Sequence, residues 1–169
     1  LTQLNIQSGQ ALTLTSFGAT NTTLSAQLTG SGNLIIGANN AAMTLNNATN
    51  NYTGTTTINA GSLSLGANDS LGQTSALIVN TSTSANLAGF SQTIGTLTNT
   101  GTVNLAGGVL TINGVGNTST SSGTLQGSGT LNVNAGTFTI NNANAGFSAA
   151  TNIASGATAT LAGVGTTLG

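Results

Sequence analysis

The chain has 169 residues and contains no lysine, arginine, histidine, cysteine or proline, and its only charged side chain is Asp69. These absences exclude most enzyme classes, because acid–base and nucleophilic catalysis need imidazole, thiolate, amine or paired carboxylate groups. We therefore predict no enzymatic activity. Without cations the chain cannot neutralise phosphates, which argues against nucleic acid as a partner. Without thiolates, imidazoles or clustered carboxylates, we expect no metal site and no cofactor.

Apolar residues are nevertheless plentiful. They make up 37% of the chain, and the mean hydropathy is +0.22. Disordered chains are usually poor in hydrophobic residues and high in net charge, so we expect this chain to fold. No apolar run approaches the ~18 residues of a transmembrane helix, and we expect no direct insertion into a membrane. The first five residues lack the basic start and apolar core of a signal peptide.

Short segments of alternating apolar and polar residues recur along the chain, each bounded by glycine, asparagine or serine. In chain order they are Gly9–Leu14, Ser31–Ile36, Ile58–Leu65, Gly101–Ile112, Gly129–Ile140 and Gly156–Gly163. Alternation with a period of two predicts β-strands. No segment keeps the i, i+3, i+4, i+7 apolar spacing of an amphipathic helix over three turns, so we expect essentially no helix.

Two of these segments, 101–112 and 129–140, match position for position at an offset of 28 residues. The match places glycine on glycine and apolar residues on apolar residues: Gly108 on Gly136, Val103 on Leu131, Leu105 on Val133, Leu110 on Phe138 and Ile112 on Ile140. Short strands in a degenerate repeat of this length predict a β-solenoid. The alternative is a β-sandwich or β-meander, but the repeat and the scarcity of aromatic residues argue against it.

We therefore predict an all-β chain in which residues 1–169 form a single β-helix segment of about six to eight coils. Each coil contributes about three strands, and successive coils stack ~4.8 Å apart. Leucine, isoleucine and valine point inward, while threonine, serine and asparagine point outward. Asparagine side chains at corners can hydrogen-bond from one coil to the next, and the candidates are Asn46, Asn47, Asn50, Asn51, Asn141 and Asn142.

One stretch, residues 50–66, resembles the passenger-associated repeat of bacterial autotransporters, which reads approximately N-x-Y-T-G-x-T-x-I-x-x-G-x-L-x-L-G. The residues that fit are Asn50, Tyr52, Thr53, Gly54, Thr56, Ile58, Gly61, Leu63, Leu65 and Gly66. Residues 85–97 and 101–103 look like the continuation of that pattern, so the clear resemblance covers residues 46–112. The motif is specific for the family, but it does not indicate one particular activity.

The resemblance implies a right-handed parallel β-helix that is secreted to the extracellular surface of a Gram-negative bacterium through a C-terminal β-barrel. Most members of the family mediate adhesion, self-aggregation or biofilm formation. The chain departs from the full pattern because it shows no export signal, barrel or capping segment. We therefore expect it to be a fragment of a longer repeat protein.

Few residues are candidates for a site. Asp69 lies in Ala67-Asn68-Asp69-Ser70, which is typical turn chemistry, and we predict a turn residue rather than a ligand or an acid. Tyr52 could stack on sugars, but a structural position at a corner of the repeat is the better interpretation. We expect the four phenylalanines to be core or cap residues: Phe17, Phe90, Phe138 and Phe147.

The threonine-rich strands suggest a more specific function as an alternative. They resemble the flat threonine ladders of ice-binding β-solenoids, and they include residues 13–15, 55–57, 137–139 and 158–160. Threonine is also simply a favoured strand residue. Since the copies are unevenly spaced in sequence, we do not expect them to form one flat array of two rows.

The best-supported function from sequence is an adhesin or self-association module that acts through polar threonine, asparagine and serine faces. Its partners would be other copies of itself, or glycans or proteins on a host or another surface. The alternative is a structural subunit of an extracellular filament that assembles by end-to-end stacking of solenoids, because uncovered strand edges template pairing. An enzyme of the polysaccharide-degrading β-helix type would need clustered acids and bases, which one aspartate cannot supply.

Overall fold

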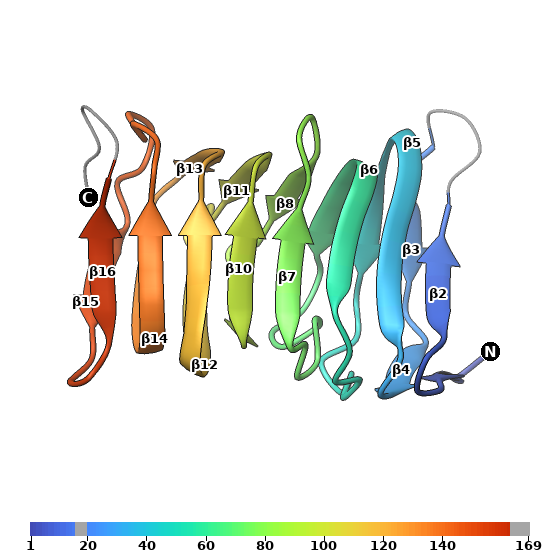
Figure 1. The fold of residues 1–169 in the computed structure, drawn as a ribbon. Coiled ribbons are helices and arrows are strands. Elements are labelled where there is room, and N and C mark those ends of the chain that lie inside the picture. The colour runs from blue at the N-terminus through green and yellow to red at the C-terminus, as the bar shows by residue number, and fades with distance from the viewer. Residues whose placement is uncertain (16–19, 163–169) are drawn as a thin grey trace.

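In the computed structural model, the chain winds into a β-solenoid of about 7 turns, with its strands standing side by side along the stack (Figure 1). The structure describes residues 1–15 and 20–162, without the side chains of residues 38–40. All the strand pairs in this part of the chain are parallel. The parallel pairing confirms the solenoid and excludes the antiparallel sandwich.

The described residues contain strands, turns and bends but no helix, as the alternating pattern predicts. Across the same residues, no helix has the length and apolar character that crossing a bilayer would require.

Each coil passes through three faces, which we name the lower, front and rear faces. The lower face consists of β1 (Gln3–Ile6), β4 (Gln27–Gly30), β9 (Ser91–Ile94), the first parts of β12 (Val109–Ser121) and β14 (Thr130–Ile140), and β15 (Ala150–Ile153). The front face consists of β2 (Ala11–Leu14), the first parts of β5 (Asn33–Leu45) and β6 (Thr56–Leu65), β7 (Ala76–Val79), β10 (Thr96–Asn99), the second parts of β12 and β14, and β16 (Thr158–Leu161). The rear face consists of β3 (Thr22–Leu24), the second parts of β5 and β6, β8 (Ser84–Asn86), β11 (Thr102–Asn104) and β13 (Thr124–Gln126).

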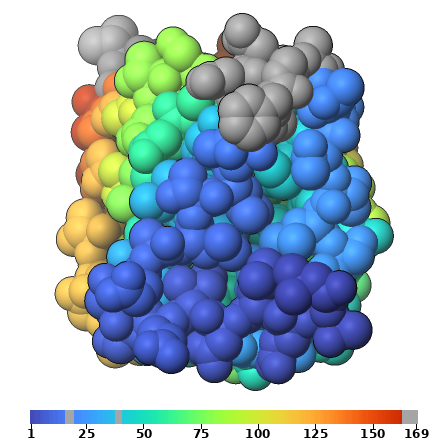
Figure 2. All heavy atoms as spheres, turned by 90° about the vertical axis from the view of Figure 1, so that its right-hand side faces the viewer, coloured from blue at the N-terminus to red at the C-terminus, as the bar shows by residue number. Residues whose placement is uncertain are grey.

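The core is a set of ladders of inward-pointing side chains, because every second residue of each strand faces the axis. On the front face one ladder runs, in register, through Leu12, Leu34, Thr56, Leu77, Leu97, Ser119, Phe138 and Ala159. Most of these side chains are buried, with terminal members partly covered. A view along the stack onto the N-terminal coil shows a filled cross-section (Figure 2). The apolar side chains therefore leave no wide channel at that end.

The coil length differs from the sequence-based repeat. Residues paired in neighbouring coils are 18 to 24 positions apart, whereas the two matched segments are 28 apart. Val103 pairs with Leu125, and Leu110 pairs with Leu131. The sequence match of Val103 with Leu131 and of Leu110 with Phe138 is therefore not a pairing between neighbouring coils. An offset of 28 spans one coil plus one strand, and it matched because strands on all three faces present the same alternation to one core.

Candidate functional site

The family-like motif forms a polar corner where the third coil passes from the lower face to the front face. Asn50 is buried there, and its Oδ1 accepts a hydrogen bond from the Leu28 backbone N–H at 2.7 Å. Its Nδ2 donates to the Ser70 carbonyl at 2.6 Å. One side chain thus joins three successive coils and satisfies two buried backbone groups, which would otherwise cost free energy.

Tyr52 lies in the same corner and is fully buried. Its hydroxyl lies 2.7 Å from Thr56 Oγ1, which lies 3.0 Å from Thr74 Oγ1. Thr74 in turn donates to the Gly54 carbonyl at 2.7 Å. Each hydroxyl has one hydrogen to donate. The three hydroxyls are all satisfied when Tyr52 donates to Thr56, Thr56 donates to Thr74, and Thr74 donates to the Gly54 carbonyl. Burial raises the pKa of Tyr52 well above its usual value, and the predicted structural role is confirmed.

The predicted asparagine corners do join coils, although their partners are backbone or serine oxygens. Asn47 Nδ2 donates to the Ser25 carbonyl at 2.9 Å, and Asn141 Nδ2 donates to Ser122 Oγ at 3.2 Å. Asparagine-to-asparagine steps occur at positions not singled out from the sequence, namely Asn80 to Asn59 at 2.7 Å and Asn152 to Asn132 at 2.9 Å.

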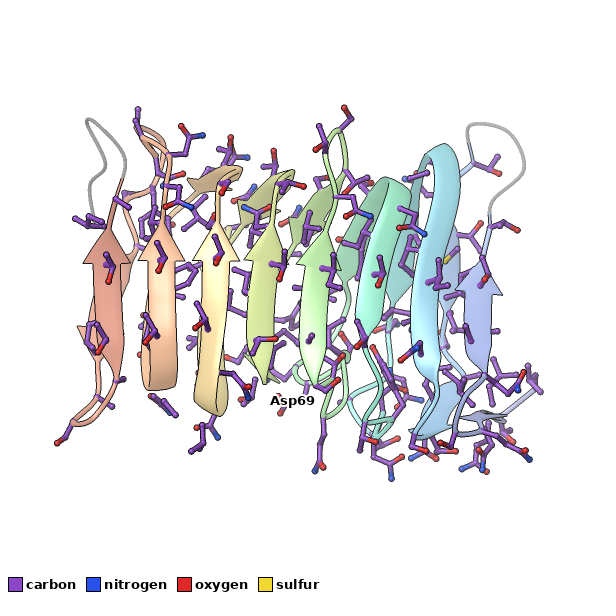
Figure 3. The ribbon with its side chains drawn as sticks, in the orientation of Figure 1. Asp69 is labelled. Carbon is purple, nitrogen blue, oxygen red and sulfur yellow. The ribbon has the colours of Figure 1, made fainter. Side chains whose placement is uncertain are left out.

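Asp69 lies at the lower edge of the stack (Figure 3) and is exposed. Its φ of 51° and the hydrogen bond from the Gly72 N–H to its carbonyl at 2.8 Å confirm the predicted turn. An open hollow of about 520 Å³ lies beside it, lined also by Gln73, Thr93 and Asn113. Among the described residues, no hydrogen bond or ion pair involves the Asp69 carboxylate, and no three histidine, cysteine or acidic residues gather at a metal-binding distance.

The phenylalanines follow the prediction where they are described. Phe138 and Phe147 are buried in the core, and Phe90 packs against it while half-buried. Phe17 lies outside the described residues. Because Tyr52 and these three rings turn inward, the described surface offers no fully exposed aromatic platform for stacking on a sugar.

The outward side of the front face carries a regular pattern over its last four strands, β10, β12, β14 and β16. We call it the threonine array, and it has two rows. The first row consists of Thr96, Thr118, Thr137 and Thr158, and the second row consists of Thr98, Thr120, Thr139 and Thr160. Strand register places Thr98 beside Thr120, Thr120 beside Thr139, and Thr139 beside Thr160.

The threonine-rich segments singled out from the sequence do not form one array, as expected, because Ala76 and Ile78 of β7 interrupt the rows after Thr55 and Thr57. Two of those segments, 137–139 and 158–160, do align with the threonines of β10 and β12 in two rows.

The second-row residues are 22, 19 and 21 positions apart, yet they align because corner loops absorb the difference. One such loop lies between Asn113 and Thr118, where the register of β12 and β14 shifts. Thr96, Thr98, Thr118 and Thr120 were not among the candidates from the sequence, although each pair forms a Thr-x-Thr tripeptide.

The hydroxyls of the array are unused by the fold. Within the described part of the chain, no intramolecular side-chain hydrogen bond involves any of these eight threonines. Four of them, Thr98, Thr118, Thr158 and Thr160, are exposed, and the other four are half-buried. On the N-terminal strands of the same face, the equivalent positions are mixed and include Asn33, Ile35, Ala76 and Ile78.

Comparison with known proteins gives one informative similarity. Over 119 residues the chain is 38% identical to the uncharacterized protein YuaQ of Escherichia coli (strain K12). The aligned region is 68% of this chain but only 8% of that protein, so the chain spans a small part of its relative's length. No family model matches the chain, and no solved structure matches it.

Proposed function

We propose that the chain is part of an extracellular adhesin or self-association module of the autotransporter-passenger type, displayed on the outer surface of a bacterium. The observation that carries this proposal is the outer surface of the solenoid, where uncharged hydrogen-bonding side chains recur in register from coil to coil. The similarity to a much longer protein supports the view that this solenoid belongs to a longer chain.

The mechanism is multivalent contact between polar faces. Each hydrogen bond contributes only about 0.5–1.5 kcal/mol net, so affinity depends on many rows that engage together. Ionic screening acts on charges, and this chain has one. Adhesion through such faces therefore depends very little on salt, in contrast to adhesion through charged patches.

Beads coated with the purified chain provide the test. We expect the coated beads to aggregate, or to bind cells or glycan-coated surfaces, equally well at low and high salt, while albumin-coated beads do neither. Absence of both activities contradicts the proposal. Electron microscopy of the free chain distinguishes an adhesin from a structural filament subunit. Long filaments that grow along the stacking axis would indicate the filament subunit.

A further inference from the structure

We propose that the threonine array is a binding surface for ice, an activity that goes beyond adhesion and does not depend on self-association. The first argument is geometric. Neighbouring strands stand ~4.8 Å apart, and residues i and i+2 of one strand lie ~6.7 Å apart. Eight threonines in two rows therefore form a rectangular net with these two spacings, which are close to the repeat distances of oxygen atoms on the faces of ordinary ice.

The second argument is rigidity. Threonine is branched at Cβ and its χ1 angle is stiff in a strand, so each hydroxyl and methyl group holds a defined position. The front strands also stand side by side with little rotation from one to the next (Figure 1), whereas open sheets usually twist by about 20–25° per strand. A flat and rigid net can match a crystal over several coils without losing conformational freedom on binding.

The third argument is the chemistry of the surface. None of the eight hydroxyls is used by the fold, so each is available to hydrogen-bond ordered water, and bridging waters are nearly as favourable enthalpically as direct bonds. No charged side chain lies in the array, since Asp69 is in the turn before β7. The groups between the hydroxyls are methyl groups, so no other polar group in the array competes for the ordered water.

Two other occupants fit less well. A sugar chain usually rests on exposed aromatic rings, which supply large flat contact areas, and the array has none. A second copy of the chain would need more surface, because the array measures about 20 Å by 10 Å, on the order of 200 Å², and a stable complex buries ~800 Å² on each partner. A crystal face offers the same lattice to every coil, so the eight threonines can engage it together.

The rest of the surface does not repeat this pattern. On the rear face, the outward residues of β6, β8, β11 and β13 mix serine, threonine, asparagine and glutamine. Some of those side chains already have partners, as Asn86 and Asn104 each accept a hydrogen bond from a backbone N–H two residues on, at 3.0 Å. General strand propensity favours threonine on every face, so it does not explain why these four consecutive strands are uniform.

The test compares two variants altered in the same coil. Thr120→Tyr places a bulky ring in the middle of the array, and Thr124→Tyr places the same ring on β13 of the rear face. Both threonines are outward-pointing and half-buried, and circular dichroism verifies the fold. Should Thr120→Tyr not fold, Thr98→Tyr replaces it.

We expect the purified wild-type chain and Thr124→Tyr to shape single ice crystals into facets and to inhibit ice recrystallisation. We expect Thr120→Tyr to require about tenfold or more protein for the same inhibition, because a protruding ring prevents the rows from engaging together. Round, unshaped crystals with the wild type, or equal behaviour of the two variants, overturn the proposal. A wild-type dimer in gel filtration that Thr120→Tyr converts to monomer also overturns it, in favour of a homotypic contact.

Discussion

The polar corner and the threonine array are both built from small polar residues, but they use them in opposite ways. At the corner, Asn50, Tyr52, Thr56 and Thr74 are buried and their hydrogen bonds hold neighbouring coils together. In the array, eight threonines keep their hydroxyls free of the fold. The contrast indicates that the motif at residues 50–66 specifies the architecture, whereas the proposed binding activities would depend on outward positions that the motif leaves open.

The substitution that we expect to destabilise the polar corner most is Gly54→Ala. A methyl group on Gly54 would overlap the carbonyl of Gly32 in the coil before it, so the two coils must separate. We expect the free energy of unfolding to fall by about 3–5 kcal/mol, measured by urea denaturation. Gly37→Ala is the matched control, because its nearest neighbour, Thr15 Cγ2, lies at an ordinary 3.6 Å. Equal effects of the two variants would contradict the close approach of coils at Gly54.

Asn50→Ala tests the bridge between three coils. It leaves the Leu28 N–H and the Ser70 carbonyl buried without their partner, and we expect a loss of about 2–4 kcal/mol. Hydrogen exchange should show the earliest loss of protection in the second to fourth coils, since each repeat is stabilised chiefly by its neighbours. Asn51→Ala, at the exposed adjacent position, should change the stability by less than about 0.5 kcal/mol.

Tyr52→Phe is a milder change, expected to cost about 1 kcal/mol at neutral pH through the lost hydrogen bond to Thr56. It also predicts a pH effect. Because the pKa of Tyr52 is raised in the folded state, its stabilising contribution is complete below about pH 10, where the unfolded chain begins to ionise, and is lost as the pH rises further. The melting temperature of the wild type should therefore fall above that pH, and in Tyr52→Phe this fall should be absent.

The smallest effect on stability, and the most direct extension of the array, comes from Ala76→Thr combined with Ile78→Thr on β7. Both positions point outward and are half-buried, so we expect the stability to change by less than about 0.5 kcal/mol. The double variant joins the array to Thr55 and Thr57 of the coil before it, giving six uninterrupted coils. We expect stronger inhibition of ice recrystallisation than with the wild type. Unchanged inhibition would mean that uniformity of the two rows is not what matters.

The sequence predicted the strands well because alternation with a period of two is a local property, and a single core makes every strand obey it. It also predicted the roles of Asp69 and Tyr52, where turn chemistry and motif position are local as well. The pairing of residues between coils and the array were not predicted, for a shared reason. Whether Thr98 stands beside Thr120 depends on how many residues each corner takes up, and loops such as the one between Asn113 and Thr118 carry no alternating signal that would reveal it.

Those corners determine where the chain can gain or lose residues. Coils of 18 to 24 residues keep their faces in register, and at the widest corner of the sixth coil Val115 is 81% exposed. Residues can be gained or lost at such a corner with little entropic cost, while the neighbouring coils stay in place. The same tolerance makes the exposed residues 115–117 a suitable point for grafting a foreign peptide onto a solenoid that carries a single charged side chain.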